Sequence, residues 1–464
     1  MKKYVIALVC LLLVGGAAVW WYLSTRDKAR DVLPADATAV AVFEPIEFVR
    51  ELGFSLNEIK NISSSIGVRW SHAFDFTKPV YAFVSESGMS GFAVNVKNAD
   101  NLQELVSAYG FASEEKQGFR WVSDENSIGC FDDDKLLMLA PVPPAEQEAM
   151  RNKMVGLMSG GKHDVPVMEN FRGMKGALKF SSTLSNLPEA YLPLLPDGTD
   201  LSGVFLNAAL RVSGQNVTVS ADVSDASFSL PLVPISGDLT GSMQPAEPFI
   251  RLCGGMKGEQ LLSIMRNVSR LRMALLGLNL IIDADLMIKA IDGNVTFVMP
   301  TADFSHPDFL LTASLANTDF LRDADEWRGR ASVSIGRRGA TDFVLKDNSN
   351  NAEVFFGVRD EHLYIAPSAE MADMAMQGAG GSDAFGEAAQ GKYLYASVDV
   401  AQLVGAYPSV QALLQTFPQA RELIDAVERL SLSSDTPQSI KLNIETNKPV
   451  KDIFLNTWKL LTGK

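Results

Sequence analysis

The chain has 464 residues, of which 47% are hydrophobic and 21% are charged. Apolar content this high can offset the entropy of ordering the backbone, which excludes a disordered chain and allows about two to three globular domains. The formal net charge of −14 opposes attraction to polyanions, so no nucleic acid is expected as a partner. Three cysteines are too few for a small scaffold built on disulfides.

The N-terminus reads as a membrane segment. Residues 4–23 are uncharged and mostly apolar, and a helix of that length spans roughly 30 Å, the thickness of a bilayer core. We therefore expect a short cytoplasmic start at 1–3, a transmembrane anchor at 4–23 that is also the contact with the membrane, and a linker at 24–32. A signal peptide cleaved near residues 16–18 is the alternative, but the bulky residues 19–22 favour an uncleaved anchor.

Sequence motifs recur in the same order along the two halves of the remaining chain. Asn98-x-Asp100-x-Leu102 matches Asn317-x-Asp319-x-Leu321, and the matches are displaced by 215 to 226 residues. Both motifs predict a turn from strand to helix, because Asn and Asp can accept hydrogen bonds from the free amides at a helix start. We predict an α+β repeat 1 at 33–236, a linker at 237–247 and an α+β repeat 2 at 248–464. The predicted fold class is therefore an internally duplicated unit of antiparallel sheet with helices packed on one face, preceded by one N-terminal transmembrane helix.

Local patterns predict the elements that open each repeat. Repeat 1 opens with a strand at 37–43 and a helix at 46–52, and repeat 2 opens with a strand at 249–253 and a helix at 259–271. Residues 271–282 are too short for a second membrane span, and the charged Arg272 interrupts them. They predict a buried helix and strand. Residues 377–391, rich in Gly, Ala and Ser, predict a mobile loop.

Motifs that imitate ligand sites have simpler interpretations. Residues 156–162 have the G-x-x-x-x-G-K spacing, but His163 replaces the magnesium-binding hydroxyl and a helix precedes them, so we interpret them as a glycine-rich helix exit. The methionines at 371, 374 and 376 could hold Cu(I), whereas the stripe at 150, 154 and 158 is typical of a core. We expect no cofactor, no metal ligand and no catalytic residue.

The cysteines, an acidic turn and a basic cluster complete the candidates. Cys130 and Cys253 lie in separate apolar runs and are interpreted as two buried thiols, with a disulfide as the alternative. Residues 132–134, all Asp, predict a solvated hairpin tip instead of a calcium loop. The weak interaction candidates are the basic cluster of an otherwise acidic chain: Trp327, Arg328, Arg330, Arg337 and Arg338.

The layout as a whole resembles a known family. A membrane segment, the motif Leu33-Pro34-Ala35-Asp36-Ala37 before the first strand and a repeated α+β part resemble the Bacteroidetes envelope proteins grouped as domain of unknown function 4836. That family has no established activity, and this chain departs from members that look like lipoproteins because it lacks a lipobox at Cys10. The resemblance implies an inner-membrane-anchored protein of a bacterial cell envelope with its ectodomain outside the cytoplasm.

These observations favour a non-enzymatic interaction or structural module over an enzyme. The expected partner is an envelope protein or a surface polymer. One alternative is a small-ligand-binding protein or enzyme with a site assembled between the two repeats. The other is Cu(I) handling by a Met-rich helix.

Overall fold

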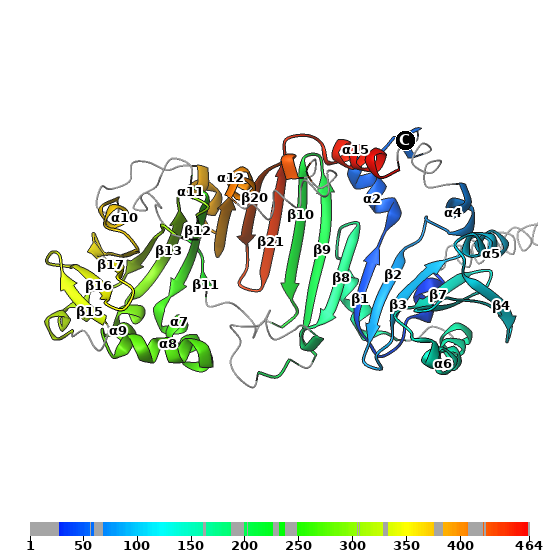
Figure 1. Cartoon of the computed structure of the whole chain (residues 1–464), viewed down its shortest axis with the longest axis horizontal. Helices are drawn as coiled ribbons and strands as arrows, with labels where there is room; N and C mark the ends of the chain where they lie inside the picture. The colour runs from blue at the N-terminus through cyan, green and yellow to red at the C-terminus, as the bar shows by residue number, and fades with distance from the viewer. Residues whose placement is uncertain are drawn as a thin grey trace, which may run out of the picture. The chain divides into compact units, whose positions relative to one another are not determined.

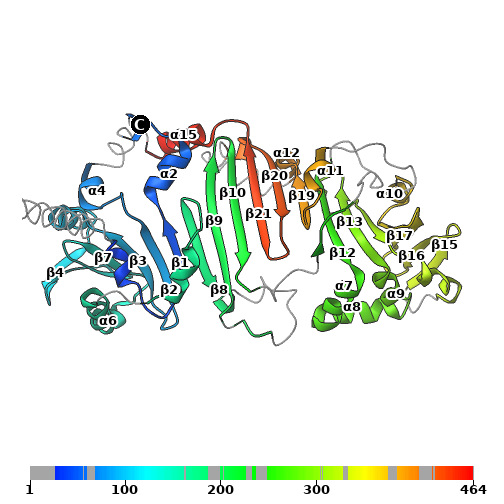
Figure 2. The same cartoon turned by 180° about the vertical axis from the view of Figure 1, so that it is seen from behind.

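The computed structural model describes residues 27–55, 57–59, 68–160, 164–186, 199–201, 203–225, 232–236, 248–303, 305, 307–327, 333–374, 384–406, 421 and 424–462. The chain divides into two compact units, unit 1 (Met1–Ser181) and unit 2 (Ser182–Lys464). Figure 1 and Figure 2 show the elements of both units from opposite sides. The described residues contain 21 strands, and each pairing whose register is defined is antiparallel.

Unit 1 is built on a meandering sheet. Its strands are β1 (Ala37–Phe43), β2 (Val80–Ser85), β3 (Ser90–Asn95), β4 (Ala112–Lys116), β5 (Phe119–Ser123), β6 (Ile128–Phe131), β7 (Lys135–Leu139) and, across the unit boundary, β8 (Leu178–Thr183). They pair in the order β8-β1-β2-β3-β7-β6-β5-β4. The β6–β7 hairpin forms the centre of the core because every residue of β6 is buried. Asp132 at its tip accepts hydrogen bonds from two backbone amides, as a solvated turn requires.

Helices cover and close the sheet of unit 1. They are η1 (Ala29–Val32), α2 (Pro45–Leu52), α4 (Val68–Ala73), α5 (Ala99–Ala108), η2 (Pro144–Glu146), α6 (Gln147–Ser159) and η3 (Pro166–Phe171). The predicted helix start at Asn98 is confirmed, because its side chain accepts a hydrogen bond from the Asn101 amide at 2.9 Å. On α6, Met154 and Met158 are buried, so this part of the methionine stripe lies in the core.

Unit 2 has the larger set of strands. They are β9 (Phe205–Ser213), β10 (Asn216–Val223), β11 (Leu232–Val233), β12 (Ile250–Lys257), β13 (Ile291–Met299), β14 (Leu310–Leu315), β15 (Val333–Arg337), β16 (Asp342–Asp347), β17 (Ala352–Arg359), β18 (His362–Ala366), β19 (Leu394–Val398), β20 (Val427–Ser434) and β21 (Ser439–Thr446). They pair in the order β9-β10-β21-β20-β19-β12-β13-β14-β18-β17-β16-β15, and β11 pairs with one end of β12.

The helices of unit 2 connect these strands. They are η4 (Leu184–Asn186), α7 (Gly258–Asn267), α8 (Ser269–Asn279), α9 (Ala284–Lys289), η8 (Asp319–Leu321), η9 (Ala324–Glu326), α10 (Ala369–Met374), α11 (Ala384–Ala389), α12 (Val400–Ala406) and α15 (Val450–Thr462). A core among the described residues of this unit lies between α7, α8, α9 and the sheet, and includes Leu262, Leu275, Phe320 and Phe343.

The same pairing order occurs in both units. The order β8-β1-β2-β3-β7-β6-β5-β4 of unit 1 corresponds, strand by strand, to β19-β12-β13-β14-β18-β17-β16-β15 of unit 2. The hairpin β9–β10, which follows β8, corresponds in the same way to β20–β21. The two hairpins pair with each other inside unit 2 through β10 and β21.

The fold class predicted from the sequence is wrong as stated. No helix among the described residues is both long and apolar enough to cross a bilayer. The longest of them, α6 and α15, have 13 residues each and so reach only about 20 Å. The predicted anchor at 4–23 lies outside the described residues. The structure contains a large antiparallel sheet of 21 strands with helices.

The structure also bears on the loop and the two linkers that the sequence predicts. In residues 377–391 the structure contains α11, whose Ala389 is fully buried against Ile235 and Cys253, so the prediction of a loop is wrong for that part. Residues 29–32, expected as linker, form η1 with Ala29 and Val32 buried. The predicted linker at 237–247 lies outside the described residues.

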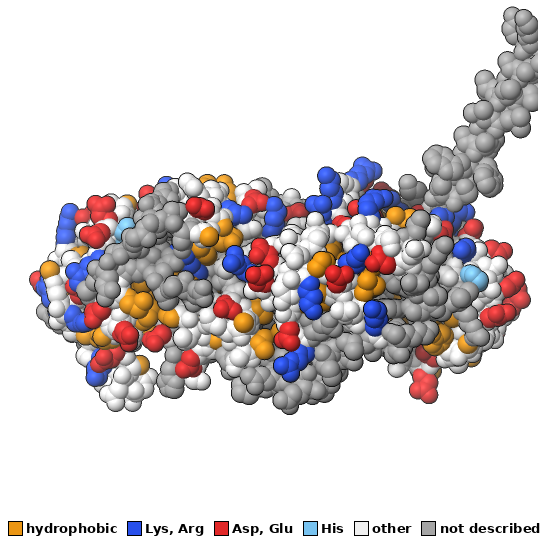
Figure 3. All heavy atoms as spheres, turned by 90° about the horizontal axis from the view of Figure 1, so that it is seen from above, with side chains coloured by type: hydrophobic (Ala, Val, Ile, Leu, Met, Phe, Trp, Pro, Cys, Tyr) orange, Lys and Arg blue, Asp and Glu red, His pale blue; other side chains and the backbone are white. Residues whose placement is uncertain are grey.

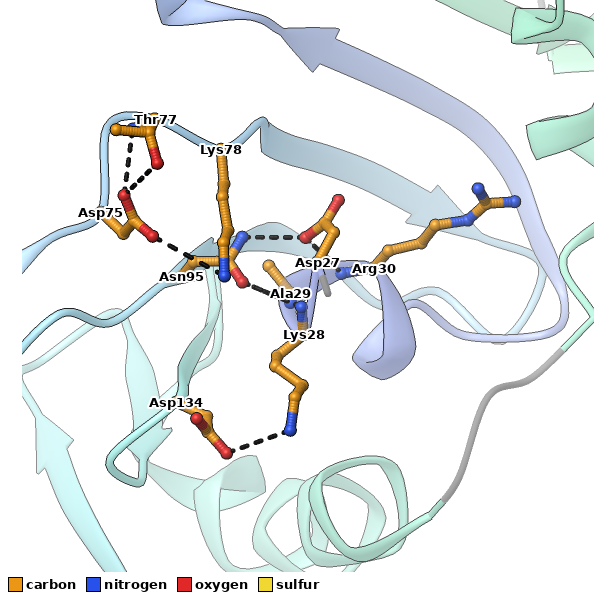
Figure 4. Close-up of polar contacts among 9 residues, drawn as sticks. All are labelled: Asp27, Lys28, Ala29, Arg30, Asp75, Thr77, Lys78, Asn95 and Asp134. Carbon is orange, nitrogen blue, oxygen red and sulfur yellow. Dashed lines mark hydrogen bonds and ion pairs between the residues drawn. The ribbon is translucent and has the colours of Figure 1, made fainter. Parts of the chain in front are cut away.

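A polar cluster fixes η1 to the sheet of unit 1, as Figure 4 shows. The buried Asn95 accepts hydrogen bonds from the backbone amides of Lys28 at 2.9 Å and Ala29 at 3.2 Å. Its side-chain amide donates to Asp27 at 2.8 Å, and the Tyr81 hydroxyl donates to the same carboxylate. One side chain therefore satisfies the backbone of an entering segment, which explains its burial.

Candidate functional site

The candidate site is the group of three helices that connects β12 to β13 in unit 2. Both views place α7 and α8 at the same end of these two strands (Figure 1, Figure 2). The inner side of the group is well packed, because Leu262 of α7, Leu275 of α8 and Met287 of α9 are buried in one core. Tertiary packing of this kind stabilises helices as short as these.

The outer side of the group exposes large apolar side chains. Met273, Leu276 and Leu280 are 66%, 54% and 58% exposed, and they have the i, i+3, i+7 spacing of one helix face. Leu278, on another side of α8, and Leu286 of α9 are 38% and 41% exposed. We call these five side chains the α8 surface. Of the twelve large apolar side chains that are exposed among the described residues, five therefore lie within 14 residues of sequence.

Such clustering differs from the scatter expected on an ordinary surface. Single exposed apolar residues are normal, whereas a contiguous group marks a site where something binds. The remaining exposed apolar side chains are distributed over many elements, for example Ile46 on α2, Phe92 on β3 and Ile440 on β21. The α8 surface is thus the strongest interaction feature in the part of the chain that the structure describes.

The α8 surface lies in a basic stretch of an acidic protein. Residues 260–282 contain Arg266, Arg270 and Arg272 and no Asp or Glu, while the whole chain has a formal net charge of −14. The Arg272 side chain is exposed beside Met273. By contrast, the face in Figure 3, seen from the opposite end of the strands, shows basic and acidic side chains interspersed.

A hollow of about 360 Å³ lies on α7 and α9 of the same group of helices. Its lining consists of Glu259, Leu262, Ser263, Arg266, Asn267 and Lys289. The guanidinium of Arg266 and the ammonium of Lys289 make the hollow cationic overall, because Glu259 is its one carboxylate. Such a lining suits an anionic group better than a cation.

Arg266 is held in place by α9. Its guanidinium forms an ion pair with Asp285, and Asn279 donates a hydrogen bond to the same carboxylate at 2.7 Å. The pKa of Asp285 is lowered, first by the hydrogen bond from Asn279 and then by Arg266, against the opposing effect of burial. Asp285 therefore stays ionised and orients Arg266 at the edge of the hollow.

The structure does not bring the basic cluster predicted from the sequence together with this site. Trp327 packs on the rings of Phe343 and Phe356, with centroids 5.0 and 6.0 Å away. Arg328 and Arg330 lie outside the described residues. The indole of Trp327 thus belongs to the core of unit 2, where it caps the aromatic pair.

The two other arginines of that cluster have internal contacts. Arg337 donates to Asp325 at 2.6 Å and to the Ala340 carbonyl at 2.8 Å, which closes the turn after β15. Arg338 lies 3.4 Å from Asp373 and its guanidinium lies over the Phe355 ring at 4.9 Å. These contacts account for both arginines structurally, and their role in binding stays a prediction.

Sequence reasoning missed the α8 surface. It interpreted residues 271–282 as a buried helix and strand, whereas the structure contains the exposed helix α8 followed by a turn into α9. The sequence did contain a signal for this surface, because the apolar residues of this segment are spread over more than one helix face. Leu275 and Ile282 are buried, while Leu276 and Leu280 are exposed, so the helix has apolar side chains on two faces and only one has an internal partner.

The methionines and cysteines singled out in the sequence do not form a second candidate site among the described residues. Met371 is buried, Met374 packs against the same small core, and Met376 lies outside the described residues. Among the described residues, no three His, Cys, Asp or Glu side chains are grouped so that they could hold a metal ion. Cys130 and Cys253 are free and buried, which confirms the interpretation of two separate thiols.

Comparison with known proteins adds little to this geometry. No family model matches the chain, and no curated protein matches it. Among solved structures, crystal forms III and IV of TP0453 are each 13% identical. They cover 45% and 43% of this chain and 84% and 82% of that one, with TM-scores of 0.30 and 0.28. The DNA polymerase III subunit beta from Borrelia burgdorferi is 9% identical over 88% of this chain and 97% of that one, with a TM-score of 0.11. Likenesses this distant carry no argument about function.

Proposed function

We propose that this protein is an interaction module that binds its partner through the α8 surface of unit 2. The observation that carries the proposal is the exposure of Met273, Leu276 and Leu280 on one face of a helix whose opposite face is packed. Keeping such a surface in water is unfavourable, by roughly 25 cal/mol for each Å² of apolar area. A bound partner removes that penalty, and burial of the side chains then contributes to affinity.

The arrangement of helices supports a binding role over a structural one. Leu275 and Leu262 already hold α8 and α7 on the core, so the outer leucines are not needed for folding. The Arg266–Asp285 pair further fixes α7 to α9 and keeps the surface in one shape. A preformed surface binds with a smaller loss of conformational freedom.

Location in a bacterial cell envelope, outside the cytoplasm, belongs to the same proposal. It is supported by the resemblance of the Leu33-Pro34-Ala35-Asp36-Ala37 start and of the motif order to an envelope family. Cell fractionation of the full chain tests it. Recovery of the protein in the cytoplasmic fraction contradicts this part of the proposal.

Site-specific photo-crosslinking tests the binding role. The photoreactive residue p-benzoylphenylalanine replaces Leu276 in the full chain, and the cells are irradiated. The controls carry it at Asp133, an exposed turn residue of unit 1, and at Ile440, an apolar side chain of β21 that is 37% exposed. We expect adducts at position 276 that both controls lack. Equal or absent adducts at all three positions contradict the proposal.

A further inference from the structure

We propose that the α8 surface binds to a lipid bilayer rich in anionic phospholipid. This inference rests on the proposed function and names the partner. Leu276 and Leu280 enter the boundary between headgroups and acyl chains, while Arg266 and Arg272 contact the phosphates. An interfacial helix of this kind has an apolar face, basic residues beside it and no need to span the membrane.

The shape of the surface favours lipid over a folded protein. The five side chains come from α8, the turn after it and α9, and the exposed fraction of Met273 reaches 66%. A protein partner would need a complementary groove for such a ridge, whereas acyl chains adapt to any convex shape. Figure 1 and Figure 2 place α7 and α8 at the ends of β12 and β13.

The charge distribution selects an anionic bilayer. A chain with a net charge of −14 is repelled by negative headgroups as a whole. Residues 260–282 contain only basic charges, so this stretch is the part of unit 2 that such a surface attracts. The opposition between local and total charge therefore fixes the orientation in which the protein approaches.

The carboxylates that follow α8 do not cancel this attraction. Asp283 caps α9, since its side chain accepts a hydrogen bond from the Leu286 amide at 3.1 Å. Asp285 is paired with Arg266 and bonded to Asn279. Both carboxylates keep their charge, but the four basic residues of 260–289 outnumber these two acidic ones, and Arg272 and Lys289 are exposed.

The hollow on α7 and α9 fits the same partner. Arg266, Asn267 and Ser263 offer donors to a phosphate that lies at the level of the headgroups. The apolar side chains and the cationic hollow belong to consecutive helices, so one approach of the bilayer can engage both. A headgroup in the hollow would add a polar contact to the apolar insertion.

The test reads the environment of single positions in the full chain. In a Cys10→Ser background, Leu276→Cys carries the polarity-sensitive fluorophore NBD, and Asp133→Cys carries it as the control. Cys130 and Cys253 are buried and react slowly with the label. A local probe is chosen because it reports contact of α8 itself, whatever else in the chain binds to the vesicles.

Vesicles of phosphatidylcholine with half phosphatidylglycerol are compared with vesicles of phosphatidylcholine alone. We expect a blue shift of the label at 276, and its quenching by lipids with nitroxide-labelled acyl chains, only with the anionic vesicles. The label at 133 stays unchanged. Arg272→Glu reverses one charge and weakens the apparent affinity about thirtyfold, and high salt acts in the same direction.

Two results overturn the inference. One is a label at 276 that shows no more acyl-chain quenching than the label at 133. The other is equal quenching with neutral and anionic vesicles, which removes the role of the arginines. If photo-crosslinking at 276 then yields protein adducts, the interaction module stands and only the lipid partner is wrong. If crosslinking also yields nothing, both proposals fail.

Discussion

Asn279 and Asp285 form a reciprocal pair of hydrogen bonds. The Asn279 side-chain amide donates to the Asp285 carboxylate at 2.7 Å, and the Asp285 backbone amide donates to the Asn279 side-chain oxygen at 3.0 Å. The pair closes the turn between α8 and α9, and the same carboxylate holds Arg266 of α7. Three helices of the candidate site therefore depend on one ionised group.

This relationship predicts an acid-sensitive site. The folded-state pKa of Asp285 lies below the unfolded value of about 3.9, so its contribution is present above that pH and is lost as pH falls through the folded pKa. The protection of residues 269–289 against hydrogen exchange, measured relative to the intrinsic exchange rate at each pH, should therefore decrease below about pH 4 in the native chain. The Asp285→Asn variant should have lower protection at neutral pH, and its protection should depend less on pH. A native chain whose protection is the same at pH 6 and pH 3 would contradict this mechanism.

Neighbouring leucines on α8 should separate folding from binding. Leu275 is 3% exposed and Leu276 is 54% exposed. Leu275→Ala should lower the free energy of unfolding by about 2–5 kcal/mol through lost burial and a cavity. Leu276→Ala should change it by about 0.5 kcal/mol at most, yet reduce crosslinking and vesicle contact. Urea unfolding followed by circular dichroism measures both variants. Equal destabilisation would show that the outer face is part of the core.

Asn95 should be the most sensitive residue of the cluster in Figure 4. Asn95→Ala leaves the Lys28 and Ala29 amides without their acceptor, and the expected loss is about 2–4 kcal/mol. Hydrogen exchange of residues 28–33 should accelerate in this variant. The matched control is Thr77→Ala, which removes an exposed hydrogen bond to Asp75 and should stay within about 0.5 kcal/mol. Similar exchange in both variants would argue against the role of Asn95.

The two buried thiols should be inert in the folded protein. Burial raises the pKa of Cys130 to about 12 and that of Cys253 to about 11. In the Cys10→Ser background at pH 8, N-ethylmaleimide should react on the order of a hundredfold more slowly than after unfolding in guanidinium. Because these pKa values are raised, the stability they reflect is present below the ordinary thiol pKa and decreases as pH rises. Rapid alkylation of the folded chain would show that these strands open readily.

Local signals allowed much of the architecture to be predicted. The strand at 37–43 agrees with β1, and the helix start at Asn98 has the expected hydrogen bond. The acidic tip at 132–134 lies between β6 and β7. In each case the decisive contacts lie within a few residues, so composition and spacing are sufficient.

Features that depend on distant partners were not predictable in this way. Leu275 and Leu276 are chemically identical, and only the position of the core of unit 2 decides which one is buried. Likewise, the Trp327 ring packs on Phe343 and Phe356 from two strands of a later hairpin. The pairing of β10 with β21 is a further example, because it leaves no local trace in the sequence.

That pairing also sets the order in which unit 2 can be completed during synthesis. Asn216 faces Glu445 in the register, so the β9–β10 hairpin emerges from the ribosome more than two hundred residues before its partner. Until residues 439–446 arrive, β10 presents an open hydrogen-bonding edge, the kind of surface on which nascent chains associate wrongly. Formation of unit 2 is therefore governed by its last hairpin, and a chain interrupted before β20 is a template for aggregation.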